Sequence, residues 1–82
     1  GNSANEEFFI IPNPYIGDFE IYIYTRWGEL VYFSEDISFR WDGTYNNKVL
    51  PVGTYAYVIR FTSIEDPNLG EQVQYGSVTL VR

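Results

Sequence analysis

Few side chains in this sequence could carry out chemistry, and most of them are carboxylates. The chain of 82 residues contains no histidine and no cysteine. Nucleophilic sites that need an imidazole or a thiolate are therefore excluded, as are the usual zinc ligand sets. Adjacent acidic pairs remain on two expected loops, Glu35-Asp36 and Glu65-Asp66, and each is most simply a solvated acidic turn. We predict that the protein is not an enzyme and uses no cofactor.

The remaining carboxylates give little support to a metal site. Asp18 and Glu20 share one face of an expected strand and have oxygens to offer calcium, but the usual loop of several acids around a glycine is missing. Asp42 precedes Gly43, and an acid in that position folds back on its own backbone as a turn former. We therefore predict no metal site.

Aromatic side chains outside the expected core are the better candidates for binding. Trp27 lies at the tip of an expected hairpin, and three tyrosines, Tyr22, Tyr24 and Tyr32, are expected off the core face. Exposed aromatic rings that lie side by side bind sugars or other proteins. The alternative is that these rings pack under loops or against a preceding domain.

Composition limits the classes of protein that fit. Eleven acidic and five basic residues give a formal net charge of −6, which argues against binding to a nucleic-acid backbone. No apolar run approaches the roughly 20 residues of a membrane-spanning helix. Residues 1–7 are polar and are expected to be a leader or linker, while residues 8–82 are expected to form one domain.

Alternating apolar residues and turn signals predict an all-β fold. Residues 19–26 and 54–62 alternate with period two, and clusters of Gly, Pro, Asn and Asp separate the expected strands. We predict an immunoglobulin-like antiparallel β-sandwich of about seven short strands. Gly76 interrupts the alternation of the closing strand and is expected to mark a bulge. The expected interior contains Ile21, Ile23, Trp41, Tyr55, Tyr57 and Ile59.

Three segments, in this order, resemble the gliding motility-associated C-terminal domain, which is the type B C-terminal sorting domain of Bacteroidota proteins exported by type IX secretion. They are Arg26-Trp27-Gly28 with its flanking strands, Trp41-Asp42-Gly43-Thr44 followed by Pro51-Val52-Gly53-Thr54-Tyr55, and the closing strand at 76–82. Three ordered motifs are more specific than any one of them. The resemblance implies that these are signature residues with a structural or recognition role: Arg26, Trp27, Gly28, Trp41, Asp42, Gly43, Thr44, Pro51, Gly53 and Tyr55.

The resemblance also implies a function. It suggests a non-catalytic sorting and attachment module that takes a larger protein through type IX secretion to the cell surface or the medium. Its partners would be the outer-membrane secretion machinery and the preceding domains of its own chain. The alternative is an immunoglobulin-like adhesion or glycan-binding module that contacts its ligand through the exposed aromatic residues, Trp27 and the three tyrosines.

Overall fold

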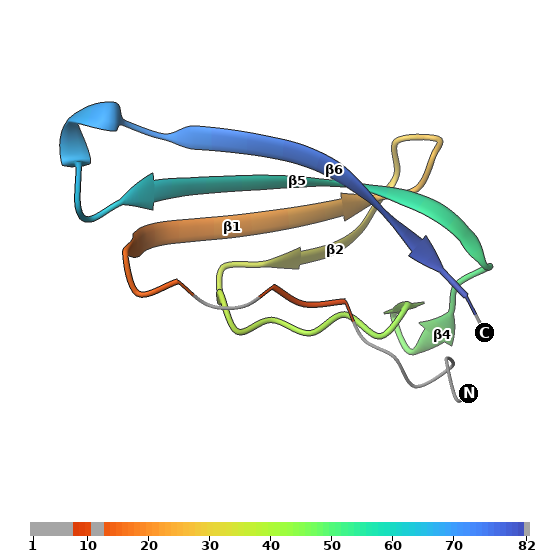
Figure 1. Cartoon of the computed structure of the whole chain (residues 1–82). Helices are drawn as coiled ribbons and strands as arrows, with labels where there is room; N and C mark the ends of the chain where they lie inside the picture. The colour runs from red at the N-terminus through yellow and green to blue at the C-terminus, as the bar shows by residue number, and fades with distance from the viewer. Residues whose placement is uncertain (1–7, 11–12, 82) are drawn as a thin grey trace.

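The computed structural model describes residues 8–10 and 13–81, so the leader expected at residues 1–7 lies outside the described residues. The described chain forms strands and one short 3₁₀ turn (Figure 1). In chain order these are β1 (Ile16–Tyr24), β2 (Leu30–Ser34), β3 (Thr44–Tyr45), β4 (Lys48–Val49), β5 (Gly53–Ser63), η2 (Pro67–Leu69) and β6 (Gln72–Leu80).

Four of the strands form one antiparallel sheet in the order β2-β1-β5-β6. Within the β1–β5 pair, Ile21 lies opposite Ile59 and Ile23 lies opposite Tyr57. Because side chains alternate between the two faces of a strand, these residues share one face of the sheet. The period-two pattern in the sequence therefore predicted the inner face of both central strands.

The layer that covers this face is mostly irregular. It contains the two-stranded β3–β4 hairpin and a single bridge between Phe8 and Trp41, both on the same side of the large sheet (Figure 1). Asp36 holds the chain in turns before it reaches Phe39, which donates its backbone N–H to the Asp36 carbonyl at 2.9 Å. The all-β antiparallel prediction is confirmed, but the seven-strand immunoglobulin-like sandwich is not.

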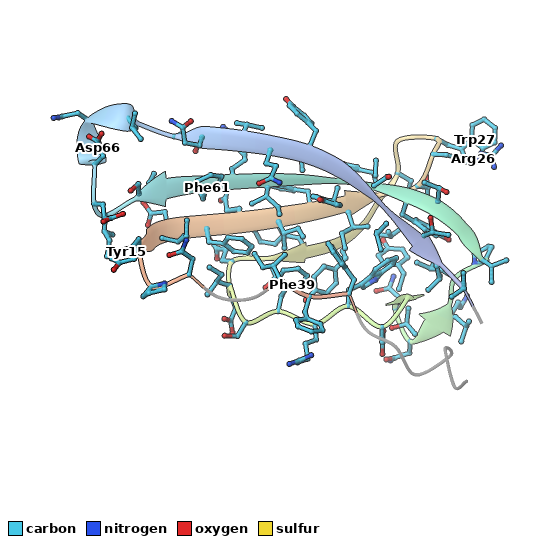
Figure 2. The ribbon with its side chains drawn as sticks, in the orientation of Figure 1. Tyr15, Arg26, Trp27, Phe39, Phe61 and Asp66 are labelled. Carbon is cyan, nitrogen blue, oxygen red and sulfur yellow. The ribbon has the colours of Figure 1, made fainter. Side chains whose placement is uncertain are left out.

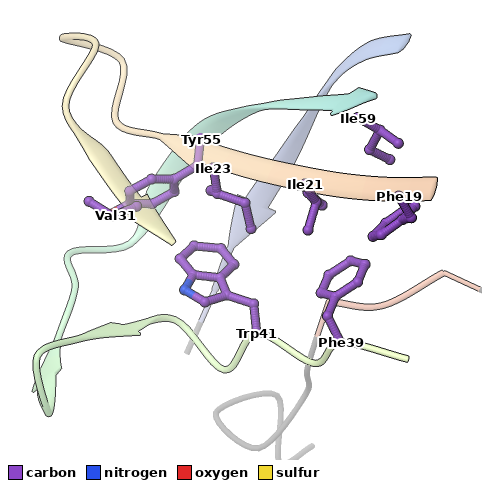
Figure 3. Close-up of a cluster of buried hydrophobic side chains, with 8 residues drawn as sticks. All are labelled: Phe19, Ile21, Ile23, Val31, Phe39, Trp41, Tyr55 and Ile59. Carbon is purple, nitrogen blue, oxygen red and sulfur yellow. The ribbon is translucent and has the colours of Figure 1, made fainter. Parts of the chain in front are cut away.

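The core lies between the sheet and this irregular layer (Figure 3). Trp41 packs edge-on against Tyr55 with ring centroids 5.4 Å apart, and its indole N–H donates to the Thr44 carbonyl at 3.2 Å. Truncating a buried tryptophan of this kind to alanine costs about 3–5 kcal/mol. The buried residues include most of the predicted interior, and Tyr57 is half-buried against them. The buried residues are Phe19, Ile21, Ile23, Val31, Phe39, Trp41, Tyr55 and Ile59.

The prediction of a bulge at Gly76 was wrong. The β5–β6 pairing runs without a shift from Gly53 opposite Leu80 to Phe61 opposite Gln72. Gly76 instead lies opposite Tyr57, and a Cβ atom at position 76 would overlap the tyrosine ring. The glycine is therefore required by the close approach of a side chain and not by an irregular backbone.

Candidate functional site

The β1–β2 hairpin ends in a tightly bonded tip. Thr25 donates its backbone N–H to the Glu29 carbonyl at 2.8 Å, and its hydroxyl oxygen accepts the backbone N–H groups of Trp27 and Glu29 at 3.2 and 3.1 Å. Gly28 has a φ of 90°, a conformation that glycine adopts without strain. These bonds fix the backbone on both sides of the Arg26-Trp27 pair.

The tip holds a large aromatic side chain in solvent. Trp27 is 84% exposed, and the Arg26 guanidinium carbon lies 5.2 Å from the centroid of its ring. Figure 2 shows both side chains projecting from one end of the molecule, away from the core. An exposed indole with a cation beside it offers both apolar area and a charge to a partner.

Contacts with buried residues hold the segment that leads into β5, residues 50–52. Leu50 donates its backbone N–H to the Gly43 carbonyl at 2.9 Å. The hydroxyl of Tyr55 donates to the Pro51 carbonyl at 2.6 Å, while the Tyr55 ring lies buried against Trp41. The buried tryptophan therefore supports the position of Pro51 through Tyr55.

A short turn joins Trp41 to the β3–β4 hairpin. One carboxylate oxygen of Asp42 accepts the backbone N–H of Thr44 at 3.1 Å and its hydroxyl at 2.7 Å. Gly43 is buried with a φ of 84°. Asp42 therefore stabilises the turn through which the chain enters the β3–β4 hairpin and reaches Leu50.

The hairpin tip and the segment before β5 face each other across a groove. They meet because Tyr24, at the end of β1, pairs with Ala56, near the start of β5. The groove has a volume of about 470 Å³ and is lined by Thr25, Arg26, Trp27, Glu29, Leu50, Pro51, Val52, Gly53, Thr54 and Tyr55. Arg26, Trp27, Pro51, Gly53 and Tyr55 from the expected signature set line the groove directly. Of the rest of that set, Gly28 lies in the tip, Trp41 lies in the core, and Asp42, Gly43 and Thr44 lie in the turn that follows Trp41.

Comparison with known protein families gives a match over residues 1–80 to the CHU_C Type IX secretion signal domain. The chain belongs to this family. No curated protein and no solved structure matched the chain in the corresponding comparisons. The type IX secretion signal domain is a sorting module that marks proteins for export to the cell surface or medium, and it interacts with the secretion machinery. The predictions of family, function and localisation are confirmed.

The signal domain has a second aromatic surface on the uncovered face of its sheet. The rings of Tyr22 and Tyr24 are stacked with centroids 6.4 Å apart, and Phe33 from β2 lies 5.0 Å from Tyr22. The Tyr22 hydroxyl donates to Glu20 at 3.0 Å, and this hydrogen bond raises the pKa of Tyr22 above its usual value. The glycan-binding alternative needs such a surface, but glycan binding itself remains a prediction.

Tyr32 does not belong to this surface, so its expected position was wrong. The β1–β2 register shifts between Ile23 and Tyr24, and Tyr32 packs toward the core with its ring centroid 6.1 Å from that of Phe39. Its neighbour Phe33 takes the outward position, which sequence reasoning missed. The sequence held no signal for Phe33, because residues 30–33 are all apolar and show no alternation that would separate the two faces of the strand.

Within the part of the chain that the structure describes, residues of the kind that bind metals do not gather in one place. In residues 8–10 and 13–81, no three His, Cys, Asp or Glu side chains converge in a metal-binding arrangement. Arg60 and Glu71 form an ion pair at the far end of the sheet, and this pairing raises the pKa of Arg60. The same described ranges contain no helix of the length and apolar character needed to span a membrane.

Proposed function

We propose that this signal domain works in sorting as a folded, non-catalytic recognition module, and that the groove between the hairpin tip and residues 50–55 is its contact with the secretion machinery. One observation carries the proposal. Two segments about 25 residues apart in the sequence, each bearing signature residues, form the two walls of a single groove.

The lining of the groove suits a protein partner. Trp27 and Val52 are exposed apolar side chains on opposite walls, while Arg26 and Glu29 add one charge of each sign. Apolar anchors carry most of the affinity of a protein contact, and charges set its orientation. Because Thr25 already fixes the tip, binding to Trp27 orders little additional backbone.

An export assay tests the proposal. The domain is fused to a periplasm-directed reporter in a bacterium that has type IX secretion, and the reporter is measured at the cell surface and in the medium. We expect Trp27→Ala to lower delivery by about tenfold or more, as loss of an interface hot spot would. The variant should keep its fold because Trp27 lies outside the core.

Tyr15→Ala is the matched control, because Tyr15 is an exposed aromatic residue at the opposite end of the molecule (Figure 2). Delivery of this variant should equal that of the wild type. If a folded Trp27→Ala variant is delivered as well as the wild type, the groove is not the contact. If a strain without the machinery delivers the reporter equally well, the sorting role itself is contradicted.

A further inference from the structure

Among the described residues, β6 is an edge strand with a free row of backbone groups. It is nine residues long and pairs with β5 alone in the described part of the chain. None of the backbone hydrogen bonds described outside the strand ladders involves β6. In an antiparallel pair, alternate residues direct their N–H and C=O groups away from the partner strand, so β6 presents such groups along its free side.

This edge has none of the features that usually prevent strands from pairing between molecules. Residues 72–80 include no charged residue and no proline, and their register with β5 has no bulge. The other edge strand, β2, has five residues and a register shift against β1. Since edge charges, prolines, bulges and short strands protect natural sheets from association, β6 is the unprotected edge.

The two ends of β6 differ in charge. Glu65 and Asp66 lie in the loop that leads into β6, whereas the hairpin tip with Arg26 lies at the other end of the molecule (Figure 2). Glu29 offsets Arg26 in that tip, so the tip adds no net charge. Pairing two copies of β6 antiparallel places the acidic loop of one copy at the same end as the neutral tip of the other, away from the other acidic loop. The chain's net charge of −6 is then not concentrated at one end of the pair.

We propose that β6 is a self-association surface, through which two copies of this domain pair antiparallel into one continuous eight-stranded sheet. The side chains allow it. Tyr75 is 76% exposed on the outer face, with Ser77 beside it on the same face and Gly76 between them on the inner face. In a two-fold pairing centred on Gly76, Tyr75 of each copy lies opposite Ser77 of the other, so a large side chain meets a small one.

Sedimentation equilibrium of the purified 82-residue chain tests this inference. We expect a monomer–dimer equilibrium over roughly 10 μM to 1 mM, the range of a small interface. The Tyr75→Lys/Ser77→Lys variant should raise the dissociation constant by about tenfold or more, because like charges then lie opposite one another across the new strand pair. Both substituted side chains are exposed, and circular dichroism checks that the fold is kept.

Thr54→Lys/Ala56→Lys is the control of equal charge. Both positions are exposed on the same face of the neighbouring strand β5, opposite Thr79 and Ser77. In the proposed dimer the control lysines of the two copies are three strand spacings apart, about 14 Å, which exceeds the screening length at physiological salt. The dissociation constant of the control should change by less than about threefold.

Amide hydrogen exchange gives a second readout that needs no variant. Alternate amides of β6 should exchange more slowly at high protein concentration, while those of β2 should not change. A wild-type chain that stays monomeric throughout, or a control that weakens the dimer as much as the β6 variant does, overturns the inference. Because the secretion machinery takes no part, such a result does not bear on the groove.

Discussion

At the scale of single residues, Gly76 makes the sharpest prediction. Its missing Cβ leaves room for the Tyr57 ring, which also packs 5.3 Å from the ring of Phe8. Gly76→Ala should destabilise the domain by about 1–3 kcal/mol, the usual cost of overpacking a close contact. Urea unfolding measures the change as a shift of the midpoint with an unchanged slope.

A double-mutant cycle separates this overlap from other effects of losing a glycine. Tyr57→Ala removes the ring, so Gly76→Ala should cost much less in that background than in the wild type. If alanine at position 76 costs the same in both backgrounds, the ring is not the reason for the glycine. The sequence showed that Gly76 breaks the alternation, but it could not show a neighbour that only strand pairing brings close.

At the scale of elements, the Asp42-Gly43 turn decides where the chain runs after Trp41. Gly43 is buried with a φ of 84°, so Gly43→Val should destabilise the domain by roughly 1 kcal/mol or more through backbone strain. Asp42→Asn should have little effect, because an amide oxygen can also accept the Thr44 hydrogen bonds. Melting temperatures of the two variants measure the difference.

Equal losses in the two variants would contradict this account of the turn. A fall in stability in Asp42→Asn alone would mean that the negative charge, and not the acceptor geometry, holds the turn.

Gly70 is a control for the backbone strain expected at Gly43, because it has a φ of 69° and open space around its Cβ position. Gly70→Ala therefore reports strain without crowding.

Strands were predicted correctly where apolar and polar residues alternate, whereas positions that depend on how strands pair were missed. The alternation in residues 19–26 and 54–62 correctly predicted β1 and β5, because both strands bury one face. The positions of Tyr32 and Phe33 depend on a register shift that no local pattern shows. The layer across the core depends on the bridge from Phe8 to Trp41, a contact between distant parts of the chain.

At the scale of the whole molecule, the fold explains why separate motifs line one groove. The resemblance named the Arg26-Trp27-Gly28 and Pro51 to Tyr55 segments, but the sequence did not place them together. The β1–β5 pairing does so, since it aligns the end of one strand with the start of the other. A groove formed in this way is lost when the sheet unfolds, so a partner that binds the groove binds only the folded domain.

The most direct test of recognition through the groove is site-specific photo-crosslinking during export in living cells. A photoreactive amino acid replaces Trp27 in one version of the exported fusion and Tyr15 in another, since both side chains are exposed but lie at opposite ends of the domain. We predict a crosslink from position 27, and not from position 15, to a component of the secretion machinery in the outer membrane. A crosslink to that component from position 15 alone, or equally from both positions, would contradict this prediction.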